Sequence, residues 1–448
     1  MELRALIVAY AFPPVGGAGV QRMAKLVKYL PDHGVRPAVL TVANPSVPLR
    51  DPSLLRDVSP ELEIVRARTF EPGYATKSAA WSATTRRSLR ARALRAATSA
   101  ARSLLVPDAQ ILWAPAAARA LAARLLARRD DAVLISGPPF SQYLLAPLAR
   151  TCAGVVLDYR DEWSTYRTSY EMTAGRASRL AGDVLEPALL RAAHLVTTAT
   201  DDFRRELLER FSFLDPARVI TVPNGWDRDD FPVPRPAPPT DRFVVTYAGT
   251  IFRLTSARGL LAGVRLLNER DPALARLLSM RFLGRIVETE RDAFAGFEGV
   301  GVEIGGYVPH DRVLAELSAS HLALCLLDAV PGAERIYPAK IFELMHLGRP
   351  ILTLAPEGAL ARLVRAHALG EVLPPRDAPA IAEALSRRLR AFRDQGPKER
   401  AAPVLRAKDV ERYDRRALAG EFAAVLREAV ASAPRRRQPR RVPRRGVV

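Results

Sequence analysis

The chain has 448 residues, 48% of them hydrophobic and 26% charged, with a formal net charge of +19. This length exceeds what one hydrophobic core usually organises, so we expect two large domains. Two cysteines, and no apolar run of about 20 residues, exclude a disulfide-framed secreted protein and a membrane-spanning one. The start, Met1-Glu2-Leu3-Arg4, lacks the pattern of a signal peptide. We therefore expect a cytoplasmic protein, in contact with the inner face of the membrane if its basic segments bind lipid.

Much of the positive charge lies at the C-terminal end. Seven arginines alternate with prolines in the last fourteen residues, so residues 431–448 are predicted to form a disordered basic tail. No zinc-finger, helix-turn-helix or aromatic RNA-binding pattern accompanies the charge, which makes nucleic acid an unlikely partner. An anionic membrane surface or a phosphate-bearing substrate fits better. Residues 77–105 are typical of an amphipathic helix at a membrane or lipid-borne acceptor, or, more commonly, of the solvated basic face of a surface helix.

Short β-type runs alternate with helical patterns along the chain, and the series starts twice. The first series comprises residues 6–10, 37–42, 133–136, 155–159, 194–198 and 219–223. A proline-rich connector at 231–241 separates it from runs at 243–249, 280–284, 302–304, 322–327 and 350–354. This alternation predicts an α/β protein with two doubly wound Rossmann-like domains, 1–230 and 242–409, that face each other across a ligand-binding cleft.

A glycine-rich loop, FPPVGGAGVQR, links the first strand to the first helix. Gly16 and Gly17 allow the backbone to approach a ligand closely, and the free amides at the helix start favour phosphate. A dinucleotide site is a poor alternative, because the spacing is not G-x-G-x-x-G and no acidic residue ends the second strand. A tight turn without a ligand would have the same composition.

A second constellation lies on a predicted helix that starts after Pro338 and ends at Gly348. Lys340 and Glu343 are three residues apart, so they share one side of its first turns. A carboxylate suits the two hydroxyls of ribose, and an ammonium suits a departing diphosphate; a surface ion pair is the alternative. After the next strand, Pro356, Glu357 and Gly358 open another helix whose free amides offer a further anion site.

Metal ligation is not predicted. Asp227-Arg228-Asp229 has the letters of an Asp-x-Asp motif, but it follows Pro223-Asn224-Gly225 near the connector, where turn chemistry explains it. The six histidines show no ligand spacing. We therefore expect no metal and no other cofactor. No nucleophile-elbow or Walker pattern supports a hydrolase or an ATPase.

Taken in order, these segments resemble the retaining nucleotide-sugar glycosyltransferases of family 4, whose fold is called GT-B. The resemblance spans roughly residues 4–425. It is carried by the glycine-rich loop, Asp158-Tyr159-Arg160-Asp161-Glu162-Trp163, Val222-Pro223-Asn224-Gly225, Tyr247-Ala248-Gly249-Thr250, Gly306-Tyr307-Val308-Pro309 and the helix of Lys340. It implies an acceptor side in domain 1–230, a donor side in domain 242–409, and a helix at 410–430 that crosses back onto the first domain.

The resemblance also assigns roles to residues. Glu343 would hold the donor ribose, and a basic pair would hold the diphosphate: Lys340 with Arg253 or Arg258, which both follow Gly249. Asp161 would orient an acceptor hydroxyl or merely cap the next helix. The family often has a second glutamate eight positions before the one matching Glu343. Arg335 stands there, with Glu334 one place earlier, so either Glu334 takes the role or the chain does without it.

The resulting prediction is a metal-independent glycosyltransferase that moves a sugar, with retention, from a nucleotide diphosphate sugar to an acceptor hydroxyl. The acceptor is open, since glycans, lipid-linked sugars and small molecules all fit. A sugar-nucleotide epimerase, which shares the two-domain cleft, and a non-catalytic nucleotide-sugar-binding protein are the alternatives.

Overall fold

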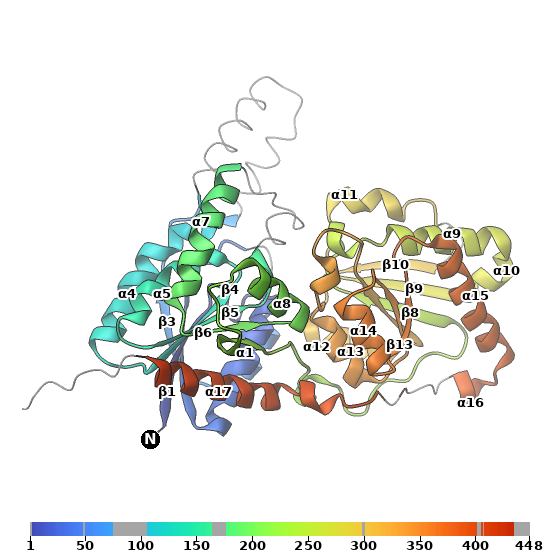
Figure 1. Cartoon of the computed structure of the whole chain (residues 1–448). Coiled ribbons are helices and arrows are strands. Elements are labelled where there is room, and N and C mark those ends of the chain that lie inside the picture. Colours follow the sequence, from blue (N-terminus) through green and yellow to red (C-terminus); the bar gives the residue numbers. More distant parts are fainter. Residues whose placement is uncertain are drawn as a thin grey trace, which may run out of the picture.

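The computed structural model describes residues 2–47, 50–74, 105–163, 176–297, 301–400, 405 and 407–433. It contains two parallel β-sheets, one in each half of the chain, with helices on both faces of each (Figure 1). The predicted class, an α/β protein with two Rossmann-like units, is confirmed. Residues 434–448 of the basic tail and nearly all of the 77–105 segment lie outside the described residues.

The first sheet has seven strands in the order β3-β2-β1-β4-β5-β6-β7. All neighbouring strands pair in parallel. Their bounds are β1 Leu3–Val8, β2 Val35–Val42, β3 Glu63–Ala67, β4 Ala132–Gly137, β5 Gly154–Tyr159, β6 Leu195–Thr198 and β7 Val219–Thr221. The order reverses between β1 and β4, and ligands of such sheets bind at the carboxyl ends of the strands beside this point.

Helices bury both faces of the first sheet, because side chains alternate along each strand. Leu6 and Val8 of β1 face a core shared with the helix α4, whereas Ala5 and Ile7 face a core shared with α1 and α17. The helices of this half are α1 Ala18–Tyr29, α4 Ala114–Leu126, α5 Ala146–Arg150, α7 Arg176–Ala192 and α8 Asp201–Arg210.

The second sheet has six parallel strands in the order β10-β9-β8-β11-β12-β13, with the reversal between β8 and β11. The strands are β8 Phe243–Ala248, β9 Leu278–Leu283, β10 Gly301–Gly306, β11 Leu322–Leu326, β12 Ile351–Leu354 and β13 Gly370–Leu373. The helices around them are α9 Arg258–Arg270, α10 Pro272–Ala275, α11 Glu288–Arg291, α12 His310–Ser318, α13 Lys340–Leu347, α14 Ala359–Ala366, α15 Ala378–Asp394 and α16 Pro397–Arg400. Of these, α9 and α15 cover one face, and α13 and α14 cover the other.

After the second sheet, the chain returns to the first half. Trp226, which precedes the connector, pairs as a β-bridge with Asp414. The helix α17, Arg415–Ser432, then runs along the first half (Figure 1). Its apolar side chains, Phe422 and Leu426 among them, share a core with β1 and α1. The last helix therefore completes the first half of the molecule.

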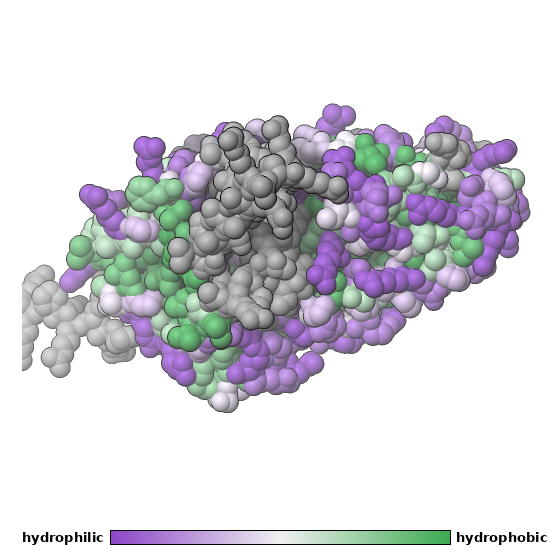
Figure 2. Space-filling model, turned by 90° about the horizontal axis from the view of Figure 1, so that it is seen from above, coloured by the Kyte–Doolittle hydropathy of each residue, from purple (hydrophilic) through white to green (hydrophobic). Residues whose placement is uncertain are grey.

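The surface differs between the two halves. Seen from above, hydrophilic residues cover most of the second half, and hydrophobic residues gather on the first half beside the part drawn in grey (Figure 2). On α7, Leu180 and Val184 are 68% and 72% exposed. Among the described helices, none combines the length and apolar character needed to cross a bilayer.

Candidate functional site

Two glycines and a lysine meet at the carboxyl edge of the second sheet. Gly249 and Gly284 follow β8 and β9 with φ angles of 138° and 133°, a region that favours glycine. A Cβ atom on Gly249 would lie 2.4 Å from Lys340 Nζ, so the ammonium fills the space that the absent side chain leaves. Lys340 Nζ also donates to the Tyr247 hydroxyl at 2.7 Å and lies 3.9 Å from the centre of its ring. No carboxylate of the described residues pairs with Lys340, so this edge carries an uncompensated positive charge.

The helix that carries Lys340 has the predicted local signals. Lys340 is the first residue of α13, two positions after Pro338. Gly348 ends the helix in the left-handed conformation with φ 72°. Ile341 and Leu344 are buried against the second sheet, which fixes the face that Lys340 presents.

Glu343 lies one turn into α13 and contacts a histidine. Its Oε1 is 2.8 Å from His310 Nε2, and 17% of its side chain is exposed. Burial favours the protonated carboxyl, but the charges of His310 and Arg415 outweigh it and lower the pKa of Glu343. Burial likewise opposes the charged imidazole, but the Glu343 and Asp230 carboxylates outweigh it and raise the pKa of His310. Both shifts favour the charged forms, a carboxylate beside an imidazolium.

The two arginines predicted as alternatives differ in their surroundings. Arg258 begins α9 and forms a bidentate pair with Asp292 at 3.0 and 2.5 Å, next to Glu290 at 3.6 Å. Arg253 is exposed and follows the Gly249 turn, and it makes no ion pair with any described residue. Of the two, Arg253 is the one whose charge is left uncompensated.

Arg335 connects the two halves of the molecule. Its guanidinium forms a bidentate pair with Glu162, with Nη2 to Oε2 at 2.8 Å. Its carbonyl oxygen accepts a hydrogen bond from the Thr200 hydroxyl, at the start of α8, at 2.7 Å. Glu334 pairs with the same guanidinium at 2.5 Å and is half-exposed. The position at which the family often has a glutamate thus holds an arginine that binds a carboxylate of the other half.

The loop before α14 packs against Glu334. A Cβ atom on Gly358 would lie 2.3 Å from the Glu334 carbonyl oxygen, so only glycine fits there without a shift. Pro356 precedes this contact, and Glu357 pairs with Arg365 at 2.6 Å on the exposed surface. No side chain caps the amino end of α14.

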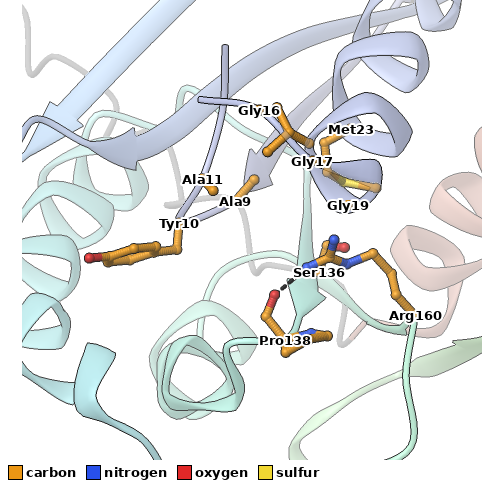
Figure 3. Close-up of a pocket in the computed structure, with 11 residues that line it drawn as sticks. Ala9, Tyr10, Ala11, Gly16, Gly17, Gly19, Met23, Ser136, Pro138 and Arg160 are labelled. Atoms are coloured by element: carbon orange, nitrogen blue, oxygen red, sulfur yellow. Dashed lines mark hydrogen bonds between the residues drawn. The ribbon is translucent and has the colours of Figure 1, made fainter. Parts of the chain in front are cut away.

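A cavity of about 200 Å³ lies at the carboxyl edge of the first sheet, where the strand order reverses (Figure 3). The glycines of the loop, including Gly16 and Gly17, line one side of it, and Ser136 of β4 and Pro138, which follows β4, line the other. The Arg160 guanidinium reaches over it toward the start of α1, and a Cβ atom on Gly19 would overlap Nη1.

Asp161 and Glu162 follow Arg160 directly. Asp161 is half-buried and does not line this cavity. Glu162 is buried and is the residue that reaches Arg335. Sequence reasoning named Asp161 and missed its neighbours on both sides, although all three belong to the segment that carried the resemblance.

A lysine occupies the position between three clustered aspartates. Lys25 Nζ lies 2.7 Å from Asp57, 2.7 Å from Asp227 and 2.6 Å from Asp230, and all four residues are buried. Oxygens of the three carboxylates lie within 4.8 Å of one another, a spacing that could hold a cation. The Lys25 ammonium occupies this position, and Lys28 and Arg56 pair with the same carboxylates. Asp227 also accepts the Asp229 amide, as expected of a turn.

The first half of the chain is similar to a known family of domains. Residues 16–225 match the family model of the glycosyl transferase 4-like domain. The glycines of the glycine-rich loop, the Arg160 segment and β7 all lie within the matched residues. No curated protein matches the chain in sequence.

Solved structures show the fold of the whole chain. Sucrose-phosphate synthase from Thermosynechococcus elongatus is similar with a TM-score of 0.63 and 16% identity, over 96% of this chain and 100% of that one. WaaG, a glycosyltransferase involved in lipopolysaccharide biosynthesis, has a TM-score of 0.53 and 15% identity, over 96% and 99%. A protein described as a UDP-N-acetylglucosamine 2-epimerase from Listeria monocytogenes has a TM-score of 0.53 and 13% identity, over 97% and 98%. The chain has the GT-B fold, and the fold alone does not separate transfer from epimerisation.

The structure brings some predicted residues together and leaves others apart. Lys340 and Gly249 touch, and Glu343 lies one turn further along the same helix. Gly16 and Gly17 lie at the edge of the first sheet instead, and Arg258 is engaged by acidic residues. The contacts of His310, Tyr247 and Arg160 were not predicted, because each forms with a residue that is distant in sequence or through the backbone of a loop.

Proposed function

We propose that the protein transfers a sugar from a nucleotide diphosphate donor to an acceptor hydroxyl, with retention and without a metal. The observation that carries the proposal is the pair on α13: an uncompensated ammonium against the Gly249 turn and, one turn later, a carboxylate with one oxygen unengaged. These groups complement a diphosphate and a ribose. They lie at the strand-order reversal of the second sheet, in a chain whose residues 16–225 match the glycosyl transferase 4-like domain.

Each residue has a part in the proposed step. Lys340 and Arg253 bind the diphosphate, and Glu343 binds the ribose. The amides of Gly16 and Gly17 and the Arg160 guanidinium face the transferred group from the first sheet. Positive charge held in place before the reaction stabilises the oxygens on which charge develops.

The chemistry balances without another reactant. The bond between the anomeric carbon and the diphosphate oxygen breaks, and its electron pair stays on that oxygen. The acceptor oxygen forms the new bond on the same face of the sugar, and its proton passes to the departing diphosphate. Asp161 orients the acceptor hydroxyl in this scheme.

Independence from metal is supported by where the positive charges lie. The clustered aspartates, Asp57, Asp227 and Asp230, are paired with three cationic side chains: Lys25, Lys28 and Arg56. At the proposed diphosphate site, Lys340 and Arg253 supply the charge that a divalent cation would otherwise bring.

Thermal melting with UDP, GDP and their sugars, in the presence of EDTA, tests the proposal. A ligand at a hundred times its Kd adds about 2.7 kcal/mol to the stability of the folded state, which raises the melting temperature measurably. We expect one of the nucleotides to raise the melting temperature of the wild type. The same nucleotide should not raise the melting temperature of Lys340→Met or of Glu343→Ala. Exposed Lys408→Met is the control and should respond like the wild type.

The same ligands separate the alternatives. An epimerase would change the sugar without releasing the nucleotide diphosphate, and a binding protein would be stabilised without any turnover. If no nucleotide stabilises the wild type, the proposal fails.

A further inference from the structure

We infer that His310 is a positioning residue for Glu343: it holds one carboxylate oxygen so that the other is presented to the ribose of the donor. The inference rests on the proposed function and adds a residue that no motif in the sequence assigns.

Among the described residues, Glu343 is the partner of the one hydrogen bond that the His310 side chain makes. The imidazole is the first residue of α12, and its Nε2 lies 2.8 Å from Glu343 Oε1 on α13. Only 8% of His310 is exposed, and its Nδ1 has no partner among the described residues. A buried ring with a single polar contact is oriented by that contact, since leaving both nitrogens unpaired would cost the full desolvation of the imidazole.

The second oxygen of Glu343 is the one available to a ligand. It accepts no hydrogen bond from a described residue, although part of the side chain is exposed. A glutamate that is free at all three side-chain torsions loses entropy when it binds a ligand. Because His310 holds one oxygen, much of the side-chain entropy is already lost in the unbound protein. The carboxylate is therefore preorganised for binding.

The charges around His310 connect this pair to the first half of the molecule. Asp230, in the segment between the two sheets, and Lys25, on α1, both act on the imidazole. Asp230 itself pairs with Lys25 at 2.6 Å and with Arg56 at 2.7 Å, whereas Glu343 is in direct contact with the imidazole. Glu343 is then the carboxylate that compensates the imidazolium, and both halves of the chain contribute to the surroundings of the pair.

A purely structural histidine is the competing explanation, and substitutions of matched shape separate the two. Gln places an amide nitrogen near the position of Nε2, so His310→Gln can still reach Glu343. Asn places its amide near the position of Nδ1, so His310→Asn keeps a polar side chain that is too short to contact Glu343. His367→Asn is the matched control: His367 is also buried in the second half, but it contacts Tyr413 and the Lys408 carbonyl.

Titration calorimetry with UDP and GDP, together with melting curves, is the experiment. We expect His310→Asn to weaken binding of the preferred nucleotide about tenfold, or about 1.4 kcal/mol, and His310→Gln to stay within about threefold of the wild type. His367→Asn should lower the melting temperature without changing the Kd. In a Glu343→Gln background, His310→Asn should have little further effect, because the carboxylate through which it acts is gone.

Each outcome supports or overturns the positioning role of His310. An unchanged Kd for His310→Asn, equal losses for the Asn and Gln variants, or an undiminished loss in the Glu343→Gln background would overturn the positioning role while leaving the proposed function standing. If the wild type binds neither nucleotide, the proposed function fails, and the inference fails with it.

Discussion

Two histidines in equivalent places predict how stability falls in acid. His194 immediately precedes β6, and His321 immediately precedes β11. In each case Nδ1 accepts the amide of the second residue of a neighbouring strand, from Val155 of β5 at 2.9 Å and from Val244 of β8 at 3.0 Å. An imidazole that accepts at Nδ1 must be neutral and carry its proton at Nε2, and in both histidines Nε2 is buried without a partner among the described residues. Burial lowers the pKa of both histidines from 6.5 to about 4.

The sign and size of the effect follow from linkage. Because the folded-state pKa lies below the unfolded value, the unfolded chain takes up the proton first as the pH falls. The stability associated with each neutral imidazole is therefore complete above pH 6.5 and is lost between pH 6.5 and about 4. At about 1.4 kcal/mol per tenfold change, each histidine accounts for a loss of about 2 kcal/mol between pH 7 and pH 5.

His321→Asn is the informative variant, since Asn Oδ1 can accept the Val244 amide and does not titrate. Urea unfolding should give similar stabilities for wild type and variant at pH 7. At pH 5 the wild type should have lost about 2 kcal/mol more than the variant. His194→Asn should behave in the same way in the first half. If wild type and variant lose stability in parallel from pH 7 to pH 5, the assignment of neutral, strand-pairing histidines is wrong.

Three further predictions concern the charged contacts. Gly249→Ala should displace the Lys340 ammonium and weaken nucleotide diphosphate binding tenfold or more in calorimetry. Gly296→Ala is the control: Gly296 has φ 77° and open space around it, so this variant should lose about 1 kcal/mol of stability through backbone strain and bind the nucleotide normally. A double-mutant cycle of Arg335→Ala and Glu162→Gln, followed by urea unfolding, should give a coupling of about 1–3 kcal/mol; additive effects would show that the pair does not link the halves. Lys25→Met should cost about 3–5 kcal/mol, and millimolar divalent cations should restore part of this in melting curves of the variant but not of the wild type.

The interior of each sheet could be predicted from sequence, but two of the edge strands could not. Residues 132–137 and 154–159 are buried throughout, so continuous apolar runs mark them as strands. β3 and β13 were missed. Both are short strands at the edges of their sheets, with mixed burial and charged residues, and they lack the apolar pattern on which the prediction relied.

The candidate site divides in the same way. The helix of Lys340 was predictable because its start, apolar stripe and end are local signals around Pro338 and Gly348. The contacts that place its charges are not local. Glu343 meets a histidine 33 positions away, and Arg335 meets a glutamate 173 positions away. The first pair depends on how α12 and α13 pack within the second half, the second on how the two halves dock, and one sequence carries no pattern for either.

The return of α17 has a consequence for how the molecule is made. Leu418, Phe422 and Leu426 are buried in the same core as β1 and α1, and each such side chain contributes about 1.5–3 kcal/mol by leaving water. During synthesis, the part of the first sheet's face that α17 covers, over β4 and β5, therefore stays exposed until the entire second half has been translated. An open apolar face of this kind favours aggregation and binding by chaperones. Cutting the chain at the connector would leave the first half without α17. The two fragments would reassemble if α17 could still pack against β1 and α1.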